Sequence, residues 1–221
     1  MLEDGTTHRE TLTTLARSAR TAGRRAVVSG RWLADTVVEM APHVPIRDLG
    51  KLSQHHDGRT GPALAKSMVQ SSGKVSAAIG GAAGGLMTMQ ELSVAGALAI
   101  PFELAAETAL VVLVELKLVA ELHTVADRPL PGGTREQAAA AVVAWLSGHG
   151  ISASSVAKSG RPDVLSRATR ARFAVMLRRR FTRNLTTVAP LLSGAAIAAW
   201  LNRRATVEIG RSLSRDLGLA A

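Results

Sequence analysis

The stretch PFELAAETALVVLVELKLVAELHTV, residues 101–125, has the highest apolar density of the chain and decides its fold class. Proline is tolerated in the first turn of a helix, so we expect a helix that begins at Pro101. A helix that is apolar on nearly all sides is either buried or spans a membrane. A span needs about 20 mostly apolar residues, and this stretch is interrupted by charges. We therefore predict the buried central helix of an all-α helical bundle. The charged residues are Glu103, Glu107, Glu115, Lys117 and Glu121.

The acidic residues of this stretch recur at helical spacing. At about 100° per residue, Glu103, Glu107 and Glu121 fall on one stripe of the helix, and Glu115 lies away from it. A buried charge without a partner costs several kcal/mol, so these carboxylates need partners. We expect an arginine of the carboxy-terminal block, Arg203 or Arg204, to bind a core carboxylate such as Glu115, with Asn202 as the alternative. The predicted buried polar cluster consists of Glu103, Glu107, Glu115, Asn202, Arg203 and Arg204.

The composition limits the function further. With 221 residues the chain is long enough to bury a proper core. It contains no cysteine, which excludes disulfides and thiolate chemistry. The amino terminus, MLEDGTTHRETLTT, has no basic-then-apolar signal, which predicts a cytoplasmic protein. The formal net charge of +10 favours polyanionic partners such as nucleic acid or an acidic membrane surface, with arginine bias from a GC-rich genome as the alternative explanation.

Residues 7–40 are predicted to form one long amphipathic helix, in which Gly23 and Gly30 are the positions where a break would fall. A basic amphipathic helix is typical of attachment to a membrane surface or a partner. The alternative is a solvated outer face on a bundle helix. We divide the chain into this amino-terminal helix, 1–44, and a helical domain, 45–221. The arginines predicted to contact a membrane or polyanion are Arg9, Arg17, Arg20, Arg24 and Arg31.

A glycine cluster follows the second predicted helix, 63–80. The sequence GGAAGG at 80–85 has small-xxx-small spacing, which lets helix backbones approach closely. A Walker nucleotide loop would need Gly at position 68 and Ser or Thr at 75, but these are Met68 and Val75. We therefore predict a tight corner between two helices.

Two further stretches, 75–102 and 184–202, carry little or no charge. Each is long enough to enter a bilayer, as a shallow hairpin or a short span. Their glycines, prolines and polar residues favour the alternative of small-residue helices buried within the bundle. The arginines between 161 and 183 spread around the helical wheel, which disfavours a reader of a nucleic-acid groove.

No catalytic or metal-binding pattern is present. His55, His56 and Asp57 are consecutive, so they cannot all face one ion in regular structure, and we expect solvated loop residues. The chain has no Glu-x-x-His pair for a di-metal bundle site and no Gly-x-Ser-x-Gly elbow. We expect no catalytic residues, no metal and no cofactor, and hence a protein that is not an enzyme.

The central block PFELAAETALVVLVELKLVAELH resembles the middle of the EcsC-like bacterial helical family, and APLLSGAAIAAWLNRRATVEIGRSL resembles the family's closing signature. The family's Tyr-Gly after the central helix is replaced here by residues 125–127. The segment 45–48, Pro-Ile-Arg-Asp, also resembles a segment of actinobacterial proteins. The matching residues are Pro101, Glu103, Glu115, Lys117, Pro190, Gly194, Asn202, Arg203 and Arg204.

The resemblance implies an association with membranes and a transporter-linked context, without catalytic residues to carry over. We expect a membrane-peripheral or scaffold protein that attaches to an anionic membrane surface through its basic amino-terminal helix. The alternative is a cytosolic helical module that binds a protein partner or, with less support, nucleic acid. The sequence leaves the oligomeric state open, a homo-oligomer included.

Overall fold

The computed structural model describes residues 5–90, 94–151, 165–188 and 194–220. It is an all-α bundle, which confirms the predicted fold class, and the described residues contain no strand. In chain order the elements are α1 (Gly5–Ala22), α2 (Arg24–Val28), α3 (Arg31–Met40), a 3-10 turn η1 (Ala41–His43), α4 (Leu49–His55), α5 (Gly61–Gln90), α6 (Val94–Val125), α7 (Thr134–Gly148), α8 (Arg167–Val188) and α9 (Gly194–Asp216).

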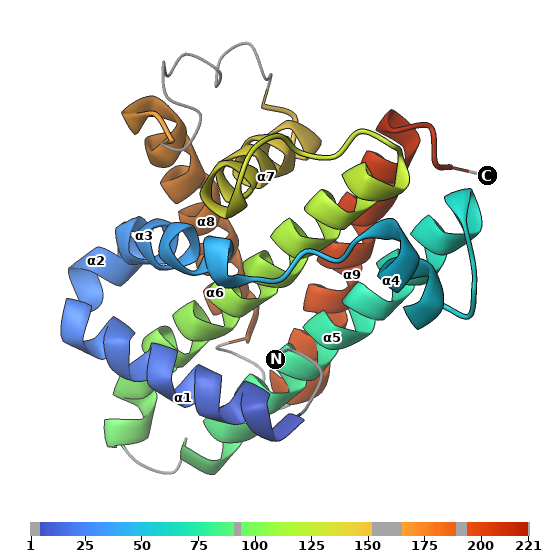
Figure 1. Cartoon of the computed structure of the whole chain (residues 1–221). Helices are drawn as coiled ribbons and strands as arrows, with labels where there is room; N and C mark the ends of the chain where they lie inside the picture. The colour runs from blue at the N-terminus through green and yellow to red at the C-terminus, as the bar shows by residue number, and fades with distance from the viewer. Residues whose placement is uncertain (1–4, 91–93, 152–164, 189–193, 221) are drawn as a thin grey trace.

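Helix α6 is the centre of the bundle. It contacts α1, α3, α5, α7, α8 and α9 and runs obliquely through the molecule (Figure 1). Nearly every side chain from Leu104 to Leu122 is buried, as the apolar sequence predicts. The helix begins at Val94, however, so Pro101 lies inside it rather than in its first turn. A proline at this position removes one backbone hydrogen bond and crowds the preceding turn, at a cost of about 3 kcal/mol, which the burial of α6 against its neighbours offsets.

The amino-terminal segment is three helices, so the prediction of one long helix over 7–40 is wrong. Gly23 and Gly30 adopt positive φ angles of 86° and 75°, which separate α1, α2 and α3. Glycine adopts such angles without steric cost. At Gly30 an added Cβ would lie 2.4 Å from the carbonyl oxygen of Ala174, so the turn also needs a small residue against α8.

These three helices share the hydrophobic core with the rest of the bundle. The apolar face predicted from the sequence is buried, mainly against α6. The amino-terminal segment is therefore a packed part of the bundle rather than a loose helix. Its core residues include Leu12, Leu15, Ala19, Val27, Leu33 and Val37.

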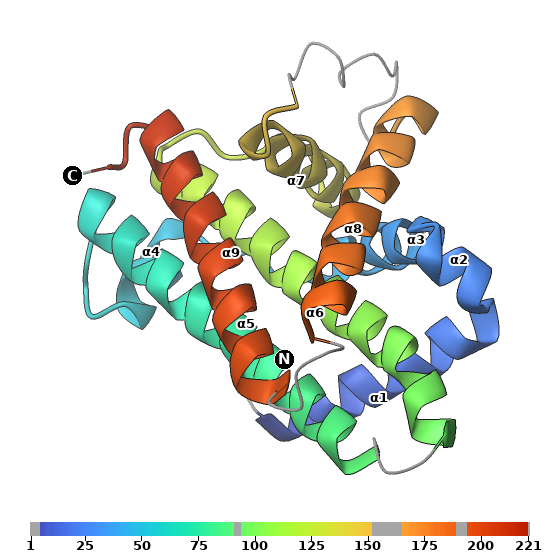
Figure 2. The ribbon, with the colours of Figure 1, turned by 180° about the vertical axis from the view of Figure 1, so that it is seen from behind.

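Helix α5 continues through the glycine cluster to Gln90, so the predicted corner at 80–85 is wrong. The predicted close approach of helix backbones does occur, between α5 and α9, which lie side by side (Figure 2). A Cβ on Gly80 would lie 2.8 Å from the backbone of Ala198, and one on Gly73 would lie 2.7 Å from Cγ2 of Val207. Within the predicted cluster, Gly80 thus contacts α9, whereas a Cβ on Gly81 would meet nothing within 4 Å.

The uncharged stretch 184–202 contributes residues to two helices. Its first residues end α8 and its last residues begin α9, while Pro190 belongs to 189–193, outside the described residues. The other apolar stretch, 75–102, is shared between the end of α5 and the start of α6. Across the described parts of the chain, no helix combines the length and apolarity needed to cross a bilayer.

Candidate functional site

Four glutamates of α6 are buried in the middle of the bundle. Their relative exposures are 7% for Glu103, 2% for Glu107, 1% for Glu115 and 3% for Glu121. Each meets a different set of neighbouring elements, so together they mark the positions where α6 is attached through polar contacts.

Glu115 has the most complete set of partners. Arg180 of α8 binds both carboxylate oxygens, with Nη1 2.6 Å from Oε2 and Nη2 3.0 Å from Oε1. The indole Nε1 of Trp145 in α7 donates to Oε2 at 2.9 Å, and the Thr206 hydroxyl of α9 lies 3.0 Å from Oε1. Burial alone would raise the pKa of Glu115, but the Arg180 charge and these donors hold it below its usual value. Glu115 is thus an ionised carboxylate that joins α6 to α7, α8 and α9.

Arg203 and Arg204 do not belong to this cluster, which corrects the prediction. Asn202 and Thr206 lie four residues apart and both face the core, so the two arginines between them face solvent. The guanidinium of Arg204 instead lies 5.3 Å from the ring centroid of Trp200.

The partner that the sequence reasoning missed is Arg180. The arginines of α8 spread around the helix, so the sequence did not indicate which of them points into the core. The signal was the spacing of buried apolar residues at Phe173, Leu177 and Phe181. Arg180 lies three residues after Leu177 and seven after Phe173, which places it at the edge of this buried stripe.

Glu107 is bound on one side only. The Nδ2 of Asn202 donates to its Oε1 at 2.5 Å, which confirms the alternative expectation that Asn202 binds a core carboxylate. Its Oε2 is buried and has no hydrogen-bond partner among the described residues. Burial raises the pKa of Glu107 to about 7, although the Asn202 hydrogen bond and the charge of Arg180 oppose the rise. This carboxyl therefore changes protonation near neutral pH inside the core.

The titration of Glu107 predicts a pH-dependent stability. Its folded pKa of about 7 exceeds its usual value of 4.5, so the folded state holds more protons between these values. We expect its contribution to the free energy of unfolding to fall as pH rises from 4.5 to about 7. In Glu107→Gln this part of the slope should disappear in urea unfolding across that range. Glu208→Gln, at an exposed position of α9, is the control. Identical slopes in wild type and Glu107→Gln would contradict the assignment.

Glu121 fixes the connector before α4 onto α6. Arg47 binds its carboxylate through the backbone N–H at 3.2 Å and through Nε at 3.0 Å. Lys117 also binds Glu121, with its Nζ 2.6 Å from Oε1, and donates to the Pro45 carbonyl. Asp48 then caps α4 by accepting from the backbone N–H of Lys51 at 2.9 Å. The segment 45–48 is thus a structural anchor.

His56 is buried, which corrects the expectation that 55–57 are all solvated loop residues. Its Nδ1 lies 2.9 Å from the Ser67 hydroxyl of α5. Burial lowers the pKa of His56, so the neutral imidazole is favoured. Within the described ranges, no three His, Asp or Glu side chains are grouped so that they could hold a metal ion.

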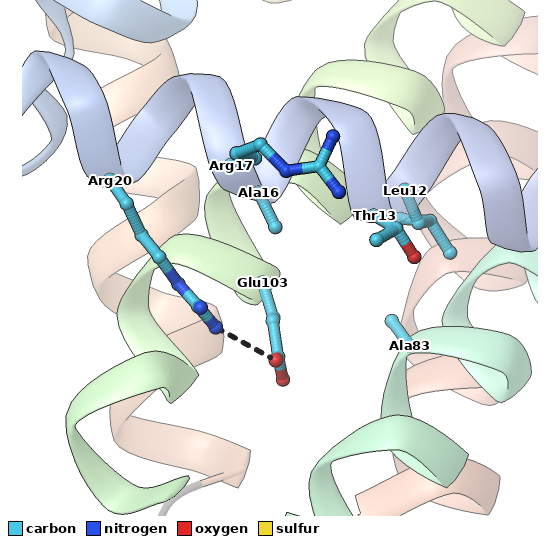
Figure 3. Close-up of a pocket in the computed structure, with 7 residues that line it drawn as sticks. All are labelled: Leu12, Thr13, Ala16, Arg17, Arg20, Ala83 and Glu103. Carbon is cyan, nitrogen blue, oxygen red and sulfur yellow. Dashed lines mark ion pairs between the residues drawn. The ribbon is translucent and has the colours of Figure 1, made fainter. Parts of the chain in front are cut away.

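Glu103 lies beside a cavity of about 200 Å³ between α1, α5 and α6 (Figure 3). Nη2 of Arg20 reaches down from α1 to within 3.5 Å of its Oε1. Arg17, one turn earlier, extends along α1 towards Thr13 instead. The lining residues are Leu12, Thr13, Ala16, Arg17, Arg20, Ala83 and Glu103.

The arginines predicted to contact a membrane or polyanion are all exposed on α1, α2 and α3; we call them the amino-terminal basic face. Two large apolar side chains elsewhere are also strongly exposed, Leu98 of α6 at 64% and Trp200 of α9 at 55%. The basic face consists of Arg9, Arg17, Arg20, Arg24 and Arg31.

Comparisons with known proteins found no matching family model, no matching curated protein and no matching solved structure.

Proposed function

We propose that this protein is a non-enzymatic, membrane-peripheral protein that attaches to an anionic membrane surface through the amino-terminal basic face. The inner face of the cell membrane, whose lipids carry negative charge, would be the site of attachment. The observation that carries the proposal is the exposure of all five arginines of this face. Three of them belong to α1, which lies at the same end of the bundle as the first turns of α6 and α9, where Leu98 and Trp200 are exposed (Figures 1 and 2).

The geometry of this end supports attachment. In both whole-molecule views α1, the last turns of α5 and the first turns of α6 and α9 occupy the lower end of the bundle (Figures 1 and 2). Leu98 lies in the second turn of α6 and Trp200 in the second turn of α9. Tryptophan is favoured at membrane interfaces because its ring is apolar and its N–H is polar. The same end therefore offers cations for lipid phosphates and apolar side chains for the layer beneath them.

The resemblance to the EcsC-like family points in the same direction. The two blocks that carry it lie on α6 and α9, and Asn202 of one block binds Glu107 of the other. The resemblance implies a membrane-linked, scaffold-type role. In this proposal Glu107 and Glu115 are structural, because their partners lie inside the bundle. These partners are Asn202, Trp145 and Thr206, which are buried, and Arg180, whose side chain is only 12% exposed.

Cosedimentation with vesicles tests the proposal. Wild type should bind vesicles of phosphatidylcholine more tightly as phosphatidylglycerol is added. Each basic residue near such a surface contributes about 1 kcal/mol, so a four-arginine variant should lose affinity by about tenfold or more. Arg20 is left in place because it binds Glu103. The variant is Arg9→Gln, Arg17→Gln, Arg24→Gln and Arg31→Gln.

A charge-matched control separates this face from net charge. Four exposed arginines towards the opposite end of the bundle are replaced in the control, which should bind like wild type. Equal losses in both variants, or wild type that stays in the supernatant at low salt, would contradict the proposal. The control is Arg128→Gln, Arg135→Gln, Arg211→Gln and Arg215→Gln.

The second candidate is a cytosolic module that binds a protein partner or nucleic acid. The supporting observation is α8, whose sequence RATRARFAVMLRRRFTRNLTTV contains seven arginines and no acidic residue. Salt weakens binding to vesicles and to nucleic acid alike, so salt dependence does not separate the two candidates. A gel-shift assay with a duplex oligonucleotide separates them. A shifted band without vesicle binding would favour nucleic acid as the partner, and the absence of both a shifted band and vesicle binding would favour a protein partner.

A further inference from the structure

We propose that the cavity between α1, α5 and α6 binds the acyl chain of an anionic amphiphile, a fatty acid or an anionic phospholipid, with Arg17 holding the charged head. This inference rests on the proposed function, because Arg17 and Arg20 of the same basic face line the cavity (Figure 3).

The shape and chemistry of the walls fit a hydrocarbon chain. The walls are mostly apolar, with Leu12 and Ala16 from α1 and Ala83 from α5. The two alanines are small, and each is at least nine-tenths buried, so the space between the helices is not filled by their own side chains. The volume of about 200 Å³ exceeds the roughly 150 Å³ of an apolar cavity that binds benzene. A segment of an acyl chain would therefore fit, and it would cover apolar surface that the fold leaves open.

The charges at the opening fit an anion. Glu103 is compensated by Arg20, whose Nη2 lies 3.5 Å away. Arg17 forms no ion pair with any described residue, and its side chain extends along α1 towards Thr13 rather than towards Glu103 (Figure 3). The described lining residues therefore carry one positive charge in excess. A carboxylate or phosphate at the opening would pair with Arg17 while its chain enters between Leu12 and Ala83.

The same charges argue against a cationic ligand. An amine placed beside Glu103 would lie close to two guanidinium groups, those of Arg17 and Arg20. Decanoate should consequently bind better than decylammonium, which has the same chain and the opposite charge. Decan-1-ol, which lacks the charge, should lie between them.

Isothermal titration of the full chain with decanoate tests the inference. We expect one decanoate per chain. Ala16→Leu fills the cavity and should weaken decanoate binding by at least about tenfold. The control Ala22→Leu makes the same change at an exposed position of α1 that does not line the cavity, and it should bind like wild type. Arg17→Gln should weaken decanoate binding by about twofold to fivefold but leave decan-1-ol binding unchanged.

The outcomes are distinct. The inference is overturned if decanoate does not bind wild type, if Ala16→Leu binds it as well as Ala22→Leu does, or if decylammonium binds more tightly. If decanoate binds as expected, vesicle cosedimentation of the same two variants identifies the source of the chain. Weaker vesicle binding by Ala16→Leu means a membrane lipid, and equal binding means a free fatty acid. Wild type that binds decanoate but no vesicle would refute the proposed function alone.

Discussion

Replacing Arg180 with glutamine is expected to lower the free energy of unfolding by about 3 to 5 kcal/mol, the usual cost of removing one partner of a buried ion pair. Glu115 would remain buried, and the loss of both guanidinium contacts would leave only Trp145 and Thr206 as its partners. The side chain of Arg180 is itself only 12% exposed, so water cannot easily replace it. The measurement is urea unfolding at neutral pH, with exposed Arg179→Gln as the control.

The pH dependence of this variant identifies the cause. Without Arg180, the burial of Glu115 would raise its pKa above the usual value of 4.5, so the carboxyl would take up a proton as pH falls. In wild type the pKa is lowered, and the contribution of the ion pair is lost only as pH falls through that lowered value. The difference in the free energy of unfolding between wild type and Arg180→Gln should therefore become smaller as pH falls towards 4.5. A deficit that stays constant with pH would mean lost packing, and Glu115→Gln with Arg180→Gln should then be no more stable than the single variant.

Alanine substitutions at two adjacent glycines of α5 should have opposite effects. A Cβ on Gly80 would lie 2.8 Å from backbone atoms of Ala198 and 2.7 Å from Nδ2 of Asn202. Because the backbone of α9 cannot move alone, we expect Gly80→Ala to cost about 2 to 3 kcal/mol of stability. A Cβ on Gly81 meets nothing within 4 Å. Gly81→Ala should therefore stabilise the protein by up to about 1 kcal/mol through helix propensity.

Thermal and urea unfolding of the two variants would measure this difference. The two share the same residue type, the same helix and the same substitution, so the contact with α9 is the main variable. Nearly equal effects would show that α5 and α9 do not lie as close at Gly80 as the structure places them. The Gly80→Ala substitution should also disturb the Asn202–Glu107 hydrogen bond, which lies at the same helix contact.

The central helix was predictable because its sequence is nearly continuous in apolar residues, and such a sequence forms either a buried helix or a membrane span. The breaks in the amino-terminal segment were harder, since glycine inside a helix costs only about 1 kcal/mol and tertiary contacts decide whether the helix continues. At Gly30 the helix breaks where the backbone of Ala174 approaches closely, and Ala174 lies more than a hundred residues away in the sequence. At Gly80 the same residue type continues a helix, because α9 packs directly against it.

The buried carboxylates were predictable as a class, and their partners only in part. A glutamate inside an apolar stretch must find a donor, but periodicity does not say which helix supplies it. Asn202 was expected as the alternative to Arg203 and Arg204, because it lies in the block that resembles the family's closing signature. The spacing of Arg180 from Phe173, Leu177 and Phe181 could place it at the edge of a buried stripe of α8, but it does not say that this stripe meets Glu115. The exposure of the basic face was predicted from the spacing of its arginines, although three helices rather than one carry them, whereas the place of α1 at the end with Leu98 and Trp200 depends on the packing of all the helices.

The contacts of Glu115 also bear on how the chain reaches its folded state. Its partners, Trp145, Arg180 and Thr206, all follow it in the sequence and come from three separate helices. During synthesis, α6 emerges with this carboxylate exposed to water, and burying it early would be costly. Contacts between residues this far apart in a chain form slowly. We therefore expect closure of the core around α6 to come late in folding, after α9 has left the ribosome.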